Sequence, residues 1–335
     1  MAERELIVIT AAGGRLGREL TAHLAAKRVR LRLVGLTVRP WFAGHETVIG
    51  DLFNPLVMKR AVEGATAIVH LAEVRPNRDL IARIGPVGYD KQMFHVNLEG
   101  TRRLALMARD AGVGRFLYAS GESVYGPPPR ECPCTEATPP APNGPYGRSK
   151  LEAEYVLNEL HRSGDLEVVV LRFATILGRF PANIAMVNRL FRLALRHLPI
   201  PLTQSGSTLK HCVHRRDAVD AIERALTRPQ ASGRTYNVAG AGAATVAEIF
   251  DAVTDALDSH SVPIPLPRLA LPVINAVTTW IGDPFILPEF ARSALEHTCY
   301  STGRALAELG FRPKYDTLQA FLEAAAWYRD HAGEQ

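Results

Sequence analysis

The chain has 335 residues, of which 47% are hydrophobic and 22% charged, and its formal net charge is +5 with a pI near 9.1. This composition excludes a largely disordered protein, and the length suits one doubly wound sheet with a smaller second lobe. The positive charge suits an anionic ligand. Nucleic-acid binding is not expected, because the sequence has neither a basic run interleaved with aromatic residues nor zinc-finger spacing.

Cysteine usage and the first residues bear on the compartment. Cys132, Cys134, Cys212 and Cys299 are too few and too scattered for a disulfide framework, so a reducing cytoplasm is expected. The N-terminus runs directly into the apolar Leu6–Ile9 without a basic region or a small-residue cleavage site, so no signal peptide is expected.

Short apolar runs alternate with helical patterns through the first two thirds of the chain, which is typical of a parallel sheet with crossover helices. Strands are expected at Leu6–Thr10, Leu31–Leu36, Ala67–Leu71, Arg115–Ala119, Glu167–Arg172 and Thr235–Val238. Helices are expected at Gly17–Ala26, Pro55–Val62, Phe94–Ala111, Ser149–Arg162 and Asp217–Thr227, where apolar residues recur three or four apart. This order predicts an α/β fold, a doubly wound parallel Rossmann sheet.

Two long connections interrupt the alternation, and long connections in compact domains are usually functional or mobile. The first is Glu73–Lys91. The second, Gly126–Pro145, holds eight prolines, so we expect it to be extended and to frame the mouth of a site.

The later chain predicts a smaller, mainly helical lobe. Helical patterns occur at Ile184–His197 and Leu318–Asp330. The apolar stretch Leu269–Ile281 is broken by Pro272 and falls short of the ~20 residues of a membrane span, so no transmembrane segment is expected. We expect a dinucleotide-binding domain over 1–178, with 210–240 returning to it, and a substrate lobe over 179–209 and 241–335.

The first expected strand runs into a glycine-rich turn, Thr10-Ala11-Ala12-Gly13-Gly14-Arg15-Leu16-Gly17, and then into a helix. A turn that binds a pyrophosphate needs glycines where a Cβ would collide, and the helix N-terminus supplies free N–H groups. Gly14 and Gly17 meet those needs, so this turn is predicted to bind a dinucleotide.

The end of the second strand bears on the choice of cofactor. Sites for NAD usually place an acidic residue there, but the candidate positions are Gly35 and Thr37. Thr37 and Arg39 could bind a 2′-phosphate, so NADP is preferred over NAD; the alternative is that Arg39 is a solvated surface residue. Asp51-Leu52 is expected to contact the adenine edge, or Asp51 simply forms a turn.

Tyr146 and Lys150 lie four residues apart, on one face of an expected helix that follows the proline-rich connection. A free phenol titrates near ~10, and a neighbouring ammonium is expected to lower the pKa of Tyr146 towards neutrality. The same lysine can bind the nicotinamide ribose, which aligns the cofactor and the phenol for proton and hydride transfer.

Together these motifs resemble the extended short-chain dehydrogenase/reductases, also called the NAD-dependent epimerase/dehydratase family, over nearly the whole chain. Further matching segments are His70-Leu71-Ala72, Asn97-Leu98-Glu99-Gly100-Thr101, Tyr118–Gly126, Arg172–Gly178 and Val213–Val219. The resemblance implies cofactor contacts at Leu71, Ala72, Glu73, Asn97, Phe173 and Thr175. It also implies a homodimer paired through the helices Phe94–Ala111 and Ser149–Arg162.

Some positions depart from the family pattern. Ala11 replaces the first glycine of the turn, and Gly121 stands where the family carries a catalytic Ser or Thr. Ser120 is our preferred replacement for that hydroxyl, with Ser123 the alternative. Glu122 matches the acid of dehydratase members, but Ser123 follows it in place of a second acid, so plain redox chemistry is preferred over dehydration. We expect Gly121, Glu122 and Ser123 to face the substrate.

Two cysteine-containing motifs are given structural interpretations. His211-Cys212-Val213-His214 is interpreted as a strand, and no metal is expected, because a second half of a zinc site is missing from the sequence. Cys132-Pro133-Cys134 resembles a redox pair but is interpreted as two free thiols.

The substrate is expected to be a small molecule. Thr175 stands where nucleotide-sugar enzymes of the family carry an asparagine that holds the diphosphate, whereas Leu269–Trp280 and the closing helix with Trp327 resemble the 3β-hydroxysteroid dehydrogenase branch. The leading hypothesis is therefore an NAD(P)-dependent oxidoreductase that interconverts a secondary alcohol and a ketone on a bulky, sterol- or terpenoid-like substrate. The alternatives are a nucleotide-sugar epimerase or reductase and a non-catalytic NAD(P)-binding regulatory protein.

Overall fold

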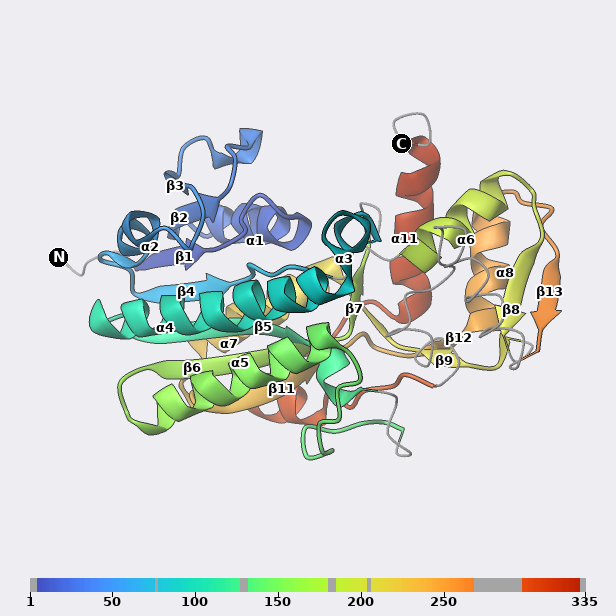
Figure 1. Ribbon diagram of the computed structural model, residues 1–335. Coiled ribbons are helices and arrows are strands. Elements are labelled where there is room, and N and C mark those ends of the chain that lie inside the picture. The colour runs from blue at the N-terminus through green and yellow to red at the C-terminus, as the bar shows by residue number, and fades with distance from the viewer. Residues whose placement is uncertain are drawn as a thin grey trace.

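The computed structural model describes residues 5–75, 78–126, 132–179, 185–203, 206–267 and 297–331. Its centre is a seven-stranded, all-parallel sheet with the order β11-β6-β5-β4-β1-β2-β3 (Figure 1). The strands are β1 (Leu6–Ile9), β2 (Arg30–Gly35), β3 (Glu46–Ile49), β4 (Ala67–His70), β5 (Arg115–Gly121), β6 (Glu167–Phe173) and β11 (Arg234–Val238). The predicted Rossmann-type α/β fold is confirmed.

All six expected strands form, and β3 is a seventh that was not among them. It lies at the edge of the sheet, beside β2, and three of its four residues are exposed. An edge strand with so little buried surface has no strong apolar pattern, which explains why the sequence did not indicate it.

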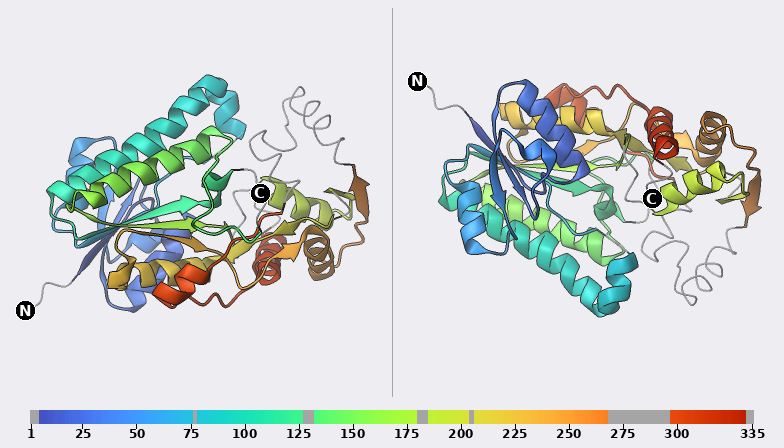
Figure 2. Two further views of the ribbon diagram at one scale, coloured as in Figure 1. Left: turned by 90° about the horizontal axis from the view of Figure 1, so that it is seen from below. Right: turned by 90° about the horizontal axis from the view of Figure 1, so that it is seen from above.

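Alternating residues of the central strands feed two hydrophobic cores, one on each face of the sheet, as the period of two in a strand requires. One core includes residues of α1 (Arg15–Ala26) and α7 (Arg215–Thr227). The other includes residues of α2 (Pro55–Val62), α4 (Thr101–Asp110) and α5 (Pro145–Arg162). Figure 2 shows the helices on both sides of the sheet. The π-helix η2 (Phe94–Gly100) runs directly into α4, so both together form the single helix expected at Phe94–Ala111.

The connection expected at Glu73–Lys91 is largely helical, which corrects that expectation. Helix α3 (Arg78–Met93) occupies it, with Gly85 at φ 69° and Pro86 inside the helix. A residue with positive φ breaks the regular helix, and the Gly-Pro pair hides the helical pattern in the sequence. The second long connection was predicted more accurately: its described part, 132–144, contains no helix and only an isolated parallel bridge, between Cys134 and Tyr300.

The described part of the later chain forms three two-stranded sheets and further helices. The strand pairs are β7 (Thr175–Leu177) with β10 (Cys212–His214), β9 (Leu209–Lys210) with β12 (Ala244–Thr245), and β8 (Ile200–Thr203) with β13 (Pro263–Leu266). The helices are α6 (Ala185–Leu195), α8 (Val246–Ala256) and α11 (Thr317–Asp330), which share a separate hydrophobic core. The short helices among the described residues are η1 (Pro40–Phe42), η3 (Glu122–Tyr125), η5 (Pro229–Ala231) and η6 (Ala305–Leu309).

The C-terminal segment does not stay within one core. Ala305 and Leu309 of η6, with Phe311, pack into the core of the parallel sheet, whereas α11 packs with α8. The apolar stretch Leu269–Ile281 lies outside the described residues. Within the described ranges, no helix has the length and apolar character needed to cross a membrane.

Candidate active site

The glycine-rich turn between β1 and α1 has the shape that a pyrophosphate requires. An added Cβ on Gly17 would lie 2.7 Å from the carbonyl oxygen of Ala11, and one on Gly14 would lie 3.1 Å from the same atom. Helix α1 begins after Gly14, which caps it with no side-chain hydrogen bond, and its first turn carries no acidic residue. The N–H groups at this helix end can therefore bind an anion, so the turn fits a dinucleotide.

The departure at Ala11 has a structural cost. Ala11 adopts φ 49°, in the left-handed region that glycine tolerates and alanine disfavours. The turn nevertheless forms, because the N–H of Gly14 donates to the Ala11 carbonyl and the Trp41 indole donates to the Ala12 carbonyl at 3.0 Å.

Positive charge surrounds this turn. The side chain of Arg39 lies over Gly13, where an added Cβ would be 3.5 Å from the Arg39 Cγ atom. Arg15 begins α1, and burial together with the charge of Arg75 lowers its pKa. Such a group of cations suits a phosphorylated ligand. Thr37 is exposed, like Arg39.

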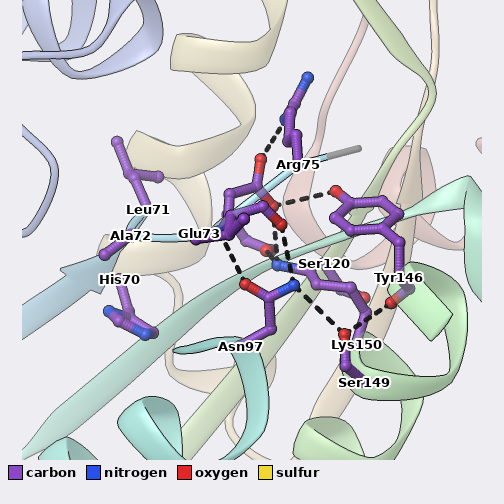
Figure 3. A network of polar contacts seen from close by, with 12 residues as sticks. His70, Leu71, Ala72, Glu73, Arg75, Asn97, Ser120, Tyr146, Ser149 and Lys150 are labelled. Atoms are coloured by element: carbon purple, nitrogen blue, oxygen red, sulfur yellow. Dashed lines mark hydrogen bonds and ion pairs between the residues drawn. The ribbon is translucent and has the colours of Figure 1, made fainter. Parts of the chain in front are cut away.

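Tyr146 and Lys150 converge at the carboxyl ends of β4 and β5, where parallel sheets of this kind bind ligands (Figure 3). Both side chains are buried, Tyr146 to 9% exposure and Lys150 to 1%. The Lys150 ammonium donates to the carbonyl of Ala119 at 2.6 Å. Gly147 allows α5 to begin here, because an added Cβ would lie 2.4 Å from the carbonyl oxygen of Ser123.

Glu73, just beyond β4, joins the two residues. Its Oε2 atom accepts hydrogen bonds from the Tyr146 phenol and from the Lys150 ammonium, both at 3.0 Å. Its other carboxylate oxygen pairs with Arg75. Although burial opposes it, the charges of Arg75 and Lys150 lower the pKa of Glu73 to about 2, so the carboxylate is ionised at neutral pH.

The pKa expectation for Tyr146 is wrong in direction. Burial and the negative charge of Glu73 raise the pKa of the Tyr146 phenol, and the opposing charges of Arg75 and Lys150 do not overcome them. The sequence expectation counted only Lys150, because nothing in the Tyr-x-x-x-Lys spacing indicates a carboxylate from another element. Tyr146 is therefore held as a protonated phenol.

The Asn97 side chain forms hydrogen bonds that position the segment after β4. Its side-chain oxygen accepts from the Val74 N–H at 2.8 Å, and its amide donates to the Val74 carbonyl and to the hydroxyl of Ser149. Asn97 thus holds the segment after β4 against α5. Thr10 fixes the start of the same segment, because its hydroxyl accepts from the N–H groups of Leu71 and Ala72.

The two serine candidates differ in their hydrogen bonds. The Ser120 hydroxyl donates to Glu154, which is paired with Arg172 in the buried core at 2.6 Å. The buried Ser123 hydroxyl has no hydrogen-bond partner among the described residues. Its oxygen lies 3.8 Å from where a Cβ on Gly121 would stand, so Ser123 occupies the region of the missing hydroxyl. These contacts favour Ser123 over Ser120, which was the preferred candidate from the sequence.

A second group of polar residues lies beyond Ser123. Glu122 accepts a hydrogen bond from the Thr175 hydroxyl at 2.7 Å and another from the phenol of Tyr300. Burial raises the pKa of Glu122, although Thr175, Tyr300 and the charge of Lys210 oppose the shift. The sequence indicated Glu122 and Thr175, but not Tyr300, which reaches them from far along the chain.

An apolar cluster surrounds Tyr146. Tyr89 and Met93 of α3 are buried against it, and partly buried side chains complete the cluster: Val74, Leu80, Ile81 and Ile84. All of these residues except Met93 come from the long connection expected at Glu73–Lys91, so the apolar wall could not be derived from the helical pattern.

The remaining predicted residues form a turn or pack in the hydrophobic cores. Asp51 accepts from the N–H of Phe53 at 2.9 Å, which is the turn-forming alternative. Leu52 packs on a face of the sheet, Leu16 packs on the opposite face, and Phe173 is buried. The segment His211–His214, interpreted as a strand, contains β10 (Cys212–His214). Among the described residues, no group of three or more His, Cys, Asp or Glu could hold a metal.

Comparison with known proteins agrees with this geometry. Residues 7–239 match the NAD dependent epimerase/dehydratase family. The dTDP-glucose 4,6-dehydratase of Streptomyces griseus is 27% identical over 277 residues, which cover 82% of this chain and 74% of the relative. Sterol demethylase protein B of Methylococcus capsulatus is 28% identical over 350 residues, covering 96% of this chain and 98% of the relative.

Among solved structures, a short-chain dehydrogenase/reductase superfamily protein from Agrobacterium tumefaciens with bound NAD has a TM-score of 0.75 and 27% identity. The match covers 98% of this chain and 99% of that one. The fold, the glycine turn and these relatives define an NAD(P)-dependent enzyme of the short-chain dehydrogenase/reductase class. Within that class, the chain belongs to the NAD dependent epimerase/dehydratase family.

Proposed function

We propose that this enzyme interconverts a secondary alcohol and a ketone on a bulky, apolar substrate, with Tyr146 as the acid–base group. The observation that carries the proposal is the buried Tyr146 phenol, which hydrogen-bonds Glu73 beside Lys150 and lies against the apolar cluster of Tyr89 and Met93. Apolar surface at the reacting group favours an apolar ligand by about 25 cal/mol per Å² buried.

The residues of this chain have separable tasks in that reaction. When bound, the nicotinamide cofactor supplies or accepts the hydride. Lys150 and Glu73 would bind its ribose, and the turn at Gly14 its pyrophosphate. In reduction, Tyr146 would donate its phenolic proton to the carbonyl oxygen of the substrate; in oxidation it would take that proton back. Ser123 would donate a hydrogen bond to the same oxygen.

The contact with Glu73 favours reduction as the working direction. A phenol that donates to an ionised carboxylate stays protonated, which is the form that reduction of a ketone requires. NADP is the preferred cofactor for two reasons. The Arg39 side chain lies over the turn, and positions 35 and 37 carry Gly and Thr, so neither has an acidic side chain that would repel a 2′-phosphate.

Two observations favour an apolar substrate over a sugar nucleotide. Thr175 stands at the position expected to hold a diphosphate, but it is hydrogen-bonded to the buried carboxyl of Glu122. A carboxyl group gives no attraction for a diphosphate. In addition, a relative that matches nearly the whole chain carries the name sterol demethylase protein B.

A nucleotide-sugar epimerase or reductase is the second candidate, supported by relatives named dTDP-glucose 4,6-dehydratase and UDP-glucose 4-epimerase. The third, a non-catalytic NAD(P)-binding regulatory protein, follows from Gly121 at the position of the catalytic hydroxyl. We also propose that the protein is cytoplasmic and forms a homodimer. Light scattering after gel filtration would test the homodimer.

A thermal-shift series with NADP, NAD, UDP-glucose and a 3-ketosteroid separates these candidates, because a ligand of the folded state raises Tm as its concentration exceeds Kd. We expect NADP and the ketosteroid each to raise Tm, and we expect net oxidation of NADPH when the ketosteroid is the substrate. Isomerised UDP-glucose without net cofactor turnover would support the epimerase instead.

We expect Tyr146→Phe to lower the rate of NADPH oxidation by about 10²- to 10⁴-fold, because it removes the transferable proton. The matched control is Tyr155→Phe, which changes an exposed tyrosine of the same helix. Cofactor binding without turnover in the wild type and in Tyr146→Phe would favour the regulatory protein, and equal measurable rates would show that Tyr146 is not the acid–base group.

A further inference from the structure

Three of the four cysteines meet where the proline-rich connection passes the segment before η6. The N–H of Cys134 donates to the carbonyl of Cys299 at 2.8 Å, and the N–H of Ser301 donates to the carbonyl of Cys134 at 2.8 Å. These two bonds flank the isolated parallel bridge between Cys134 and Tyr300. The backbone therefore fixes two segments side by side that are far apart in the sequence.

Within this junction the side chain of Cys132 lies close enough to Cys299 to raise the pKa of the Cys299 thiol. None of the four cysteines is in a disulfide; Cys132 is exposed and Cys299 is half-buried. The buried Cys134 thiol instead faces the carbonyl of Thr135 at 3.7 Å. The side-chain interaction thus joins Cys132 to Cys299, whereas the sequence motif Cys132-Pro133-Cys134 was interpreted as two free thiols.

Metal binding does not explain the pair. Groups of three or more His, Cys, Asp or Glu with metal-binding geometry do not occur in the parts of the chain that the structure describes. A pair of adjacent thiols, one of them accessible to solvent, is instead the arrangement in which a reversible disulfide forms.

We propose that Cys132 and Cys299 are a redox modification site, at which a low-molecular-weight disulfide such as oxidised glutathione converts the two thiols into an intramolecular disulfide. The Cys132 thiolate attacks one sulfur of glutathione disulfide, which breaks that S–S bond and releases one glutathione thiolate. Cys299 then loses its proton and attacks the Cys132 sulfur, releasing the second glutathione. Two cysteine thiols are oxidised, and one glutathione disulfide is reduced.

The order of these steps follows from the environment of each thiol. Cys132 is exposed and so meets the glutathione disulfide first. Burial and the neighbouring Cys132 raise the pKa of Cys299 to about 11, so this thiol stays protonated at neutral pH. It therefore reacts second, after the Cys132 sulfur that the backbone holds nearby has taken up the glutathione.

The disulfide would act next to the candidate active site. Cys299 directly precedes Tyr300, whose phenol is hydrogen-bonded to Glu122. The connection that carries Cys132 leads into α5, which presents Tyr146. A disulfide between the two segments would therefore hold together both sides of the site. It would also close a long loop between Cys132 and Cys299, which lowers the conformational entropy of the unfolded chain.

The experiment treats the full chain with oxidised glutathione, followed by peptide mapping and thermal unfolding. We expect a Cys132–Cys299 cross-linked peptide and a rise in Tm of about 5 °C, since closing a long loop stabilises the folded state. Dithiothreitol should reverse both. Cys132→Ser and Cys299→Ser should each abolish the Tm rise, whereas Cys212→Ala, which changes a cysteine outside the junction, should retain it.

Three results would overturn the proposal: glutathione retained on Cys132 as a mixed disulfide, a Cys132–Cys134 peptide as the product, or an unchanged Tm after the cross-link has formed. The readouts are peptide masses and unfolding temperatures, so they do not depend on which substrate the enzyme uses.

Discussion

The carboxylate of Glu73 accepts hydrogen bonds from the acid–base phenol and from the ammonium that the sequence motif pairs with it. Lys150 therefore does not act on Tyr146 alone, because the negative charge of Glu73 offsets its effect on the phenol. At this scale a single carboxylate determines which form of the phenol is present at neutral pH.

We expect Glu73→Gln to lower the pKa of Tyr146, because the substitution removes the negative charge that raises it and leaves Lys150 and Arg75, which lower it. Alcohol oxidation needs the phenolate, so its rise with pH should move to lower pH in the variant. Profiles of kcat/KM against pH for wild type, Glu73→Gln and the exposed control Glu152→Gln measure the shift. An unmoved profile for Glu73→Gln would show that Glu73 does not control the proton.

The two serines at the end of β5 should respond differently to substitution. Ser123→Ala removes a hydroxyl with no partner among the described residues, and we expect kcat/KM to fall about 10²-fold, as for other lost oxyanion donors. Ser120→Ala removes a donor to Glu154 and should cost about 1 kcal/mol of unfolding free energy, with little loss of rate. The reverse pattern would restore Ser120 as the catalytic hydroxyl.

Sequence spacing was sufficient to find Tyr146, Lys150 and the glycine turn, because their separation along one helix or turn fixes their geometry. It could not find the contact of Glu73 with Tyr146, which joins residues 73 apart in the chain. Choosing between Ser120 and Ser123 also required the structure, since the answer depends on which side chain Glu154 reaches.

At the scale of elements, a buried ionic network joins β6 to α5. Arg172 of β6 donates to Glu154 of α5 at 2.6 Å and to the phenol of Tyr125, which in turn donates to Asn237 of β11. Arg172 and Glu154 are both buried. The network fixes the helix that presents Tyr146 and Lys150 against the sheet.

Glu154→Gln should therefore destabilise the fold by about 3–5 kcal/mol, because it leaves the buried Arg172 charge without its counterion. Urea unfolding measures the change, and Glu152→Gln, an exposed position on the same helix, is the control with an expected change below about 0.5 kcal/mol. A loss under 1 kcal/mol for Glu154→Gln would mean that water or other groups compensate the arginine.

Elements with strong apolar periodicity were predictable within a few residues, as α1, α2, α5 and α7 illustrate. Among the elements that were missed, β3 and α3 lack that signal for different physical reasons. Strand β3 is an edge strand that buries little, and α3 is interrupted by Gly85 and Pro86. Tertiary packing, which the sequence pattern does not report, stabilises both.

At the scale of the whole molecule, the C-terminal segment connects the two parts of the fold. Phe311 is fully buried in the core of the parallel sheet, and Phe321 of α11 lies in the core shared with α6 and α8. Between them, the N–H groups of Lys314 and Tyr315 donate to Asp217 of α7, both at 3.0 Å. One short stretch of chain thus contributes to both cores.

This arrangement predicts that the two parts unfold as one cooperative unit. Phe311→Ala and Phe321→Ala should each destabilise the protein by about 3–5 kcal/mol, because each empties a buried aromatic site. Both variants should still show a single thermal transition, raised by NADP to a similar extent, since any ligand of the folded state stabilises the whole unit. Two transitions in Phe321→Ala, with only the later one raised by NADP, would show that the α11 core unfolds independently of the sheet that binds the cofactor.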